Sequence, residues 1–290
     1  MSDIPRLNRV IAALERGKPA FTSFTPADRG AAIAFASSKY DGIVFEMEHN
    51  PWDILGLRDS LQYMLDRGAI AKSGSIAPAC APMVRIPPNG EEIAQFHAKQ
   101  ALDVGVYGIV WPHISDVEQA YNAVGACRYP RQKSAPLYEP RGVRGDGPTQ
   151  AMRYWGLGQQ EYYSRADVWP LNPQGEIFVI LMIEDSTGIA NLDDILANVP
   201  GIGAILIGEG DLSQELGYPR QYDHKVVRDA MAQIVATCKR HDVPVGHPHV
   251  DAGNVERVLE EGYRFLMTSP VRTTPGLDRG LELSGRAGES

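Results

Sequence analysis

Cysteine is scarce in this sequence of 290 residues, and the three cysteines present lie far apart. Cys80, Cys127 and Cys238 have neither the spacing of a disulfide framework nor that of a thiolate metal site. None has an evident base beside it, so we expect all three to be buried packing residues.

An excess of positive charge and long apolar runs are also missing. The chain has 28 Lys and Arg against 36 Asp and Glu, a net charge of −8, which argues against nucleic-acid or anionic membrane partners. No apolar run approaches the roughly 20 residues that span a bilayer. Residues 1–17 are typical of a mixed-charge amphipathic helix rather than of a signal peptide. We therefore expect a soluble, cytoplasmic protein.

Short apolar runs alternate with helical patterns along the chain, and the first strand–helix turn lacks the glycine-rich dinucleotide-binding fingerprint. Eight strands are expected, near Ala20–Phe24, Gly42–Glu48, Pro82–Ile86, Gly108–Trp111, Ile177–Glu184, Ala204–Gly208, Val243–Gly246 and Phe265–Thr268. Helices are expected at Ala27–Ser38, Leu55–Arg67, Glu91–Leu102, Asp116–Cys127, Leu192–Asn198, Val226–His241 and Ala252–Glu261. This alternation predicts a single-domain α/β fold over residues 1–290, a (β/α)8 TIM barrel. A doubly wound open sheet is the alternative, and it usually has fewer strands.

One segment interrupts the alternation, between the fourth and fifth expected strands. Residues 129–176 are rich in glycine, proline and aromatic side chains, and a loop of that length is usually functional or disordered. The aromatic content argues against disorder, so we expect this excursion to cover the barrel mouth or to form a subunit contact. The tail, residues 284–290, is expected to be disordered.

Charged side chains follow several of the expected strands. The second strand is followed by Glu46, Glu48 and His49, three ionisable groups that are costly to bury unpaired. In a barrel all strands end at one mouth, where barrel enzymes carry out their chemistry. The same geometry is expected to bring further side chains there: Arg85, His113, Glu184, Asp211 and His247.

Glu184 and Asp211 lie one β-α-β step apart, at the ends of neighbouring expected strands. Two carboxylates from adjacent strands suit a hard divalent cation that keeps several waters, such as Mg²⁺ or Mn²⁺, with Co²⁺ as an alternative. The competing interpretation is that each carboxylate caps the helix that begins just after it.

Arg85 and His49 are the candidate catalytic side chains. At the end of a buried strand Arg85 needs an acidic or carbonyl partner; it could stabilise an enolate oxygen, or form a structural ion pair with Glu46 or Glu48. His49 can act as a general base near neutral pH when a carboxylate such as Glu46 or Glu48 orients it.

Two further features are weaker. His247 and His249 stand on either side of Pro248, which is expected to end the strand, so lining of the substrate pocket is favoured over metal ligation. At Gly210 the backbone can closely approach a small anion.

An ordered set of segments resembles the HpcH/HpaI aldolase family from about Ala20 to Arg279. The segments are FEMEHN, PMVRIP, GIVWP, CRYPR…RGVRG, ILMIEDSTGIANLDDIL, VPGIGAILIGEGDLSQELGYP and EEGYRFLM. The resemblance implies a (β/α)8 barrel and a metal-dependent class II pyruvate aldolase. It also implies a homo-oligomer, usually a hexamer built as a trimer of dimers with the last helix exchanged.

The resemblance also implies roles for individual residues. Glu184 and Asp211 match the family's metal ligands, and Arg85 matches the arginine that binds the keto oxygen and enolate. His49 matches the histidine of the family's D-x-E-H segment, which acts in proton transfer. The amides near Gly210 and Asp211 would hold the pyruvate carboxylate.

The sequence departs from the family pattern around the expected pocket. Glu46 replaces the usual aspartate of D-x-E-H, Met182 a glutamine, and Glu209 a proline. Further departures are Trp111, His113, His247 and His249. We expect Trp111, His113, Met182 and His247 to contact substrate, so the acceptor would differ from that of the well-known members.

The expected reaction is reversible cleavage of a 4-hydroxy-2-oxo acid to pyruvate, or hydroxypyruvate, and an aldehyde. Trp111 and the aromatic excursion suggest a bulky or aromatic aldehyde. Two alternatives stay open: another enolate-forming lyase, of the citrate/malyl-CoA or decarboxylating kind, and a non-catalytic barrel that binds a metal and an oxo acid.

Overall fold

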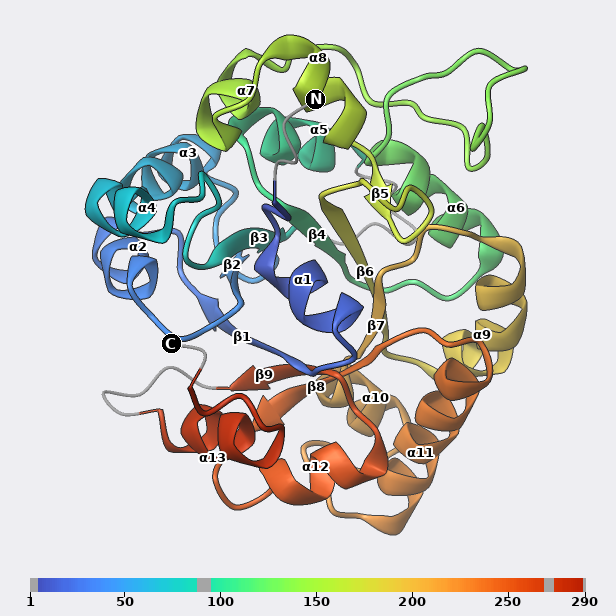
Figure 1. Ribbon diagram of the computed structural model, residues 1–290. Coiled ribbons are helices and arrows are strands. Elements are labelled where there is room, and N and C mark those ends of the chain that lie inside the picture. The colour runs from blue at the N-terminus through green and yellow to red at the C-terminus, as the bar shows by residue number, and fades with distance from the viewer. Residues whose placement is uncertain (1–4, 88–94, 269–273, 289–290) are drawn as a thin grey trace.

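The computed structural model describes residues 5–87, 95–268 and 274–288 (Figure 1). Its strands are β1 (Ala20–Thr25), β2 (Gly42–Glu46), β3 (Ala81–Arg85), β4 (Gly108–Trp111), β5 (Val168–Trp169), β6 (Ile177–Ile183), β7 (Ala204–Ile207), β8 (Val245–Val250) and β9 (Phe265–Thr268). The strands pair in parallel, and pairing of β4 with β6 and of β1 with β9 closes eight of them into a barrel. The predicted TIM barrel is confirmed, and the short β5 is an addition on the edge of β6.

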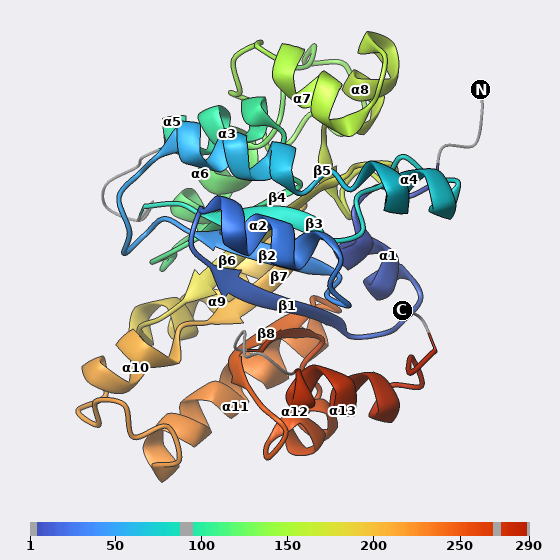
Figure 2. The same ribbon diagram turned by 90° about the vertical axis from the view of Figure 1, so that its left-hand side faces the viewer.

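Helices surround this barrel (Figures 1 and 2). They are α1 (Arg9–Glu15), α2 (Arg29–Ala36), α3 (Ile54–Tyr63), α4 (Arg67–Ser73), α5 (Gln95–Val104), α6 (Val117–Ala126), α7 (Thr149–Trp155), α8 (Gln159–Arg165), α9 (Ser186–Asn198), α10 (Glu209–Glu215), α11 (Lys225–Arg240), α12 (Val255–Glu261) and α13 (Pro275–Leu283). The first four residues of the helix expected at Glu91–Leu102 lie outside the described residues.

Aspartates start many of these helices. The carboxylate of each accepts a backbone N–H three residues on, which satisfies one of the amides that have no partner inside the helix. The capping residues of α2, α3, α4, α6 and α9 are Asp28, Asp53, Asp66, Asp116 and Asp185. At β6 the cap is thus Asp185, which leaves the neighbouring Glu184 available for another role.

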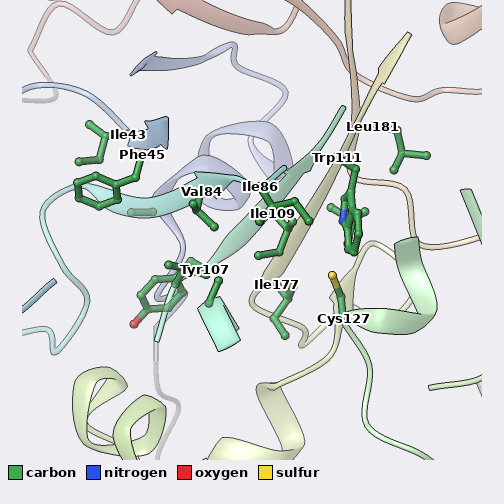
Figure 3. Packing of buried hydrophobic residues seen from close by; sticks show 14 of the residues in the cluster. Ile43, Phe45, Val84, Ile86, Tyr107, Ile109, Trp111, Cys127, Ile177 and Leu181 are labelled. Atoms are coloured by element: carbon green, nitrogen blue, oxygen red, sulfur yellow. The ribbon is translucent and has the colours of Figure 1, made fainter. Parts of the chain in front are cut away.

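The alternation of side chains along each strand divides the apolar residues into two layers. In β6, Phe178, Ile180 and Met182 belong to the cluster inside the barrel. Ile177 and Leu181 belong to the cluster between barrel and helices (Figure 3). The strand is therefore apolar at every position, as parallel strands covered on both faces are.

Helix α1 closes the amino-terminal end of the barrel. Its Val10, Ile11 and Ala13 are fully buried in the inner cluster, and Figure 1 shows the helix across the centre of the ring. The Asn8 side chain caps it and also donates to the Tyr107 carbonyl, 3.0 Å away. With this end filled, the opposite end, where the strands finish, is the one available to a ligand.

The excursion of residues 129–176 lies at the closed end. Trp155 donates to the Gly105 carbonyl at 2.9 Å and stacks on Tyr107 at 4.6 Å, and both partners precede β4. Figure 2 shows α7 and α8 beyond α5, with which α7 is in contact. The first of the two predicted roles, covering the mouth, is therefore wrong, whereas a subunit contact stays a prediction.

The described part of the tail is ordered by a buried ion pair. Arg286 lies 2.6 Å from Asp41, its other guanidinium nitrogen donates to the Pro19 carbonyl at 2.6 Å, and both charged side chains are 2% exposed. An arginine at this position was expected in a disordered segment. Nothing in the small and polar residues around Arg286 indicates that its partner, Asp41, lies 245 residues away in the sequence.

Candidate active site

Arg85 is the centre of an ion-pair cluster at the barrel mouth. It ends β3 and is in register with Glu46, which ends β2, so both side chains point inside. The Arg85 Nε donates to Glu46 Oε2 at 2.6 Å, and its Nη1 lies 3.0 Å from Glu48 Oε2. The Phe24 ring covers the guanidinium carbon at 4.6 Å. These contacts hold the guanidinium in one direction, because its planar fork leaves little rotational freedom once bound.

Glu46 contacts His49 in a different way from the one expected. Its Oε1 accepts the backbone N–H groups of Glu48 and His49 at 2.9 and 3.1 Å. The His49 imidazole is 67% exposed, and its Nε2 lies 3.6 Å from Glu48 Oε2. Glu48 is therefore the carboxylate that faces the His49 imidazole. Glu46 instead stabilises the backbone turn after β2 and holds the Arg85 guanidinium in place.

His113 bridges two buried carboxylates. Its Nε2 lies 3.4 Å from Glu48 Oε1, and its Nδ1 lies 3.4 Å from Glu184 Oε2. The same Glu184 oxygen accepts the His113 backbone N–H at 2.7 Å, a geometry reached with φ at +55°. The hydrogen bond with Glu48 raises the pKa of His113 to about 9, with further support from the charges of Glu184 and Asp211. At neutral pH His113 is a cation between these carboxylates.

Glu184 is the most enclosed acid of the site, with 2% of its side chain exposed. Burial raises its pKa to about 7, and the charges of Glu48 and Asp211 add to the increase. Gly208 makes room for it, because an added Cβ there would collide with the Glu184 carboxylate. A buried, partly protonated carboxylate beside two other acids is a site where added positive charge would be stabilised.

Asp211 lies in the first turn of α10 and is exposed. Its charge acts on both Glu184 and His113, which places it on the same mouth. Amides of a helix's first turn have no partner inside the helix, and binding of a substrate carboxylate by those near Gly210 stays a prediction. Within the described residues no three His, Cys, Asp or Glu side chains converge as a complete metal site.

The remaining expected site residues fall into two groups. Met182 points inside the barrel, and its Sδ lies 3.8 Å from Arg85 Nη1. Trp111 is fully buried in the layer between barrel and helices, near Cys127 and Leu181 (Figure 3). His247 also faces outward, against the Tyr263 ring. Trp111 and His247 are therefore not directed into the mouth, because each lies two positions along its strand from a residue of the outer layer, Ile109 and Val245 respectively.

Strand β8 also ends at a different residue from the one predicted. It continues through Pro248 to Val250, with an irregular register between His247 and Val250. The expectation that Pro248 ends the strand is wrong, because an irregular register relieves the missing ladder hydrogen bond.

The contacts of two residues at the site, Phe24 and Glu48, were not predicted in full from the sequence. Phe24 has no motif of its own, and only its inward register on β1 indicates the contact with Arg85. Glu48 was considered only as a partner of His49 or Arg85, yet it contacts His49, Arg85 and His113. Its side chain is only 4% exposed, which no local pattern indicates, because His49 after it is polar and exposed.

The chain is similar to known proteins over most of its length. A protein-family model described as HpcH/HpaI aldolase/citrate lyase matches residues 22–269. The hydroxypyruvate/pyruvate aldolase of Roseobacter denitrificans is 30% identical over 264 residues, 90% of each chain. The 2-dehydro-3,6-dideoxy-6-sulfogluconate aldolase of Pseudomonas putida is 31% identical, covering 85% of this chain and 84% of that one.

A solved structure extends the comparison to the fold. The crystal structure of an HpcH/HpaI aldolase/citrate lyase family protein from Burkholderia cenocepacia superposes with a TM-score of 0.70 at 25% identity, covering 94% of this chain and 95% of that one. The sequence resemblance, the closed parallel barrel and the family match over most of the chain agree. The chain belongs to the HpcH/HpaI aldolase/citrate lyase family.

Proposed function

We propose that this protein is a metal-dependent carbon–carbon lyase, a class II aldolase. It would reversibly cleave a 4-hydroxy-2-oxo acid to pyruvate, or hydroxypyruvate, and an aldehyde. One observation carries the proposal: a continuous set of contacts from Glu46 through Arg85, Glu48 and His113 to Glu184 at the open end of the barrel. The relatives named as aldolases support it.

The acidic part of the mouth fits a divalent cation. Glu184 and Asp211 supply hard oxygen donors, and the raised pKa of Glu184, about 7, reflects burial and unbalanced negative charge that a cation would relieve. Mg²⁺ and Mn²⁺ accept two protein oxygens and complete their coordination with water and substrate. A bound cation would polarise the 2-oxo group of the substrate as a Lewis acid.

Arg85 is the proposed stabiliser of the enolate. A guanidinium has five N–H donors, and Glu46 and Glu48 engage only part of this set. Because the carboxylates already fix its plane, the remaining donors are oriented before substrate arrives. Such preorganisation is what makes a donor effective against charge that develops in the transition state.

Proton transfer from the 4-hydroxyl is assigned to His49, with Glu48 rather than Glu46 as its carboxylate partner. An exposed imidazole can exchange its proton with water between turnovers. His113 is held as a cation by Glu48 and Glu184, so in this assignment it donates a hydrogen bond rather than accepting the substrate proton.

No particular class of aldehyde is proposed as the substrate or product. The two features that suggested an aromatic aldehyde, Trp111 and the excursion, are directed away from the mouth. A cytoplasmic homo-oligomer, a hexamer of the trimer-of-dimers kind, remains our expectation, and light scattering after size-exclusion chromatography would measure it. The family description also includes citrate lyases, so another enolate-forming lyase is the second candidate.

A coupled assay tests the proposal. Chelator-treated protein is supplied with 4-hydroxy-2-oxo acids, with or without Mn²⁺, and pyruvate release is followed with lactate dehydrogenase. Pyruvate release that Mn²⁺ restores, and that Glu184→Ala abolishes together with Mn²⁺ binding, is expected. Absence of release with Mn²⁺ bound would contradict the aldolase assignment and favour the second candidate or a binding protein.

A further inference from the structure

A cavity lies outside the barrel, between α11, α12 and the carboxyl end of β8. Its volume is about 640 Å³, within the range of small-molecule sites. Glu209, His247 and His249, three departures noted in the sequence, all line it. We propose that this cavity binds a small organic anion with an apolar body, at a site separate from the barrel mouth.

The polar end of the cavity joins two buried side chains, Glu209 and His247, to the partly exposed His249. Glu209 is 2% exposed and pairs with the His249 imidazole, on which the Tyr222 ring stacks at 5.5 Å. The His247 Nδ1 accepts the His249 backbone N–H at 3.2 Å. Since Nδ1 accepts, Nε2 of a neutral His247 carries the proton and is a donor, and burial favours the neutral form by lowering its pKa.

The apolar wall comes from one face of α11. Met231, Ala232, Val235 and Ala236 line the cavity at the i, i+1, i+4 and i+5 spacing of one helix face. The two alanines leave room that larger side chains would fill. This wall suits an aromatic or branched aliphatic body rather than a free inorganic ion.

One arginine of the lining, Arg228, is available to an anion. Lys225 pairs with Asp229 at 2.5 Å, and Arg257 pairs with Glu261 at 2.8 Å. Among the described ion pairs none involves Arg228, which also lines the cavity. Lys239 adds a second cation, whose Nζ donates to the Glu261 carbonyl. The lining also holds Glu209 and Asp223, so its four basic and four acidic side chains balance overall. A carboxylate or sulfonate would pair locally with Arg228, because arginine suits such planar or tetrahedral oxyanions.

The test uses 1-anilinonaphthalene-8-sulfonate, an aromatic sulfonate whose fluorescence rises on binding. We expect one saturable site on the full-length protein. Ala232→Trp should fill the cavity and weaken binding at least tenfold, whereas Gln233→Trp, the next exposed α11 residue outside the lining, should leave it unchanged. Arg228→Glu should also weaken binding about tenfold, with Arg240→Glu on the same helix as its control.

Two further measurements make the result decisive. Titration in the presence of Mn²⁺ and saturating oxalate should leave the affinity unchanged, and displacement by oxalate would place the probe at the mouth and overturn the proposal. Sedimentation of Ala232→Trp should show the wild-type mass; a smaller assembly would mean that a second copy of the chain covers the cavity. Absence of binding, or equal binding by Ala232→Trp and Gln233→Trp, would also overturn it.

Discussion

The Glu184 carboxylate combines near-complete burial with two acidic neighbours, Glu48 and Asp211. Its position depends on a residue that has no side chain, because Gly208 follows β7 where a methyl group would occupy the space of the carboxylate. At the residue scale, the site is therefore as sensitive to added volume as to lost charge.

Gly208→Ala should displace Glu184 and lower Mn²⁺ affinity at least tenfold, with a parallel loss of pyruvate release. Gly210→Ala, two residues on, is the matched control, because an added Cβ there would meet nothing within 4 Å. Electron paramagnetic resonance of free Mn²⁺ measures the Mn²⁺ affinity of both variants. Equal affinities in the two variants would contradict the packing argument.

Arg85→Ala should lower kcat/KM by about 10²–10³, or roughly 3–4 kcal/mol of barrier, the usual cost of losing one oxyanion donor. Mn²⁺ affinity should be kept, because Glu184 and Asp211 remain. Arg85→Lys restores the charge without the fork and should recover only part of the activity. Wild-type kcat/KM in Arg85→Ala would refute the role assigned to Arg85.

At the element scale, the strands that carry the site could be predicted well. Runs such as Ile177–Ile183 are apolar at every position, which identifies a strand buried on both faces, and the charged residue after each run marks the mouth. Which face a side chain takes was harder: Trp111 and His247 stand near strand ends, yet their register turns them outward. One residue of register reverses a side chain's direction, and the predicted end of the strand that carries His247, Gly246, lies four residues before the observed end, Val250.

Burial of His247 on β8 makes stability depend on pH. Burial lowers the pKa of His247 below the ordinary 6.5, so between the two values the unfolded chain binds more protons than the folded one. The stability contributed by neutral His247 is therefore complete above pH 6.5 and is lost as the pH falls through the folded pKa. Urea midpoints measured from pH 8 to 5 should fall less steeply in His247→Gln than in wild type.

The barrel as a whole has one filled end and one open end. Helix α1, the excursion and the tail all pack near the ends where strands begin, and the ionisable cluster lies where they finish. The end that carries the ionisable cluster could be predicted from the charged residues that follow the expected strands. The Arg286–Asp41 pair could not, because no local pattern relates two residues so distant in the chain.

Arg286→Ala should lower the free energy of unfolding by roughly 3–5 kcal/mol, since it leaves the buried Asp41 charge unpaired. Arg279→Ala removes an exposed arginine of the neighbouring α13 and should cost less than about 1 kcal/mol. Urea denaturation followed by circular dichroism measures both. A similar cost in the two variants would mean that the pair contributes little.

The same pair has a consequence for folding during synthesis on the ribosome. Asp41 lies against β1, where it accepts the Phe21 backbone N–H at 2.8 Å, but its arginine follows 245 residues later in the sequence. A nascent barrel therefore lacks this ion pair until residue 286 has left the ribosome. Chains cut before residue 286 would keep the Asp41 carboxylate without its arginine.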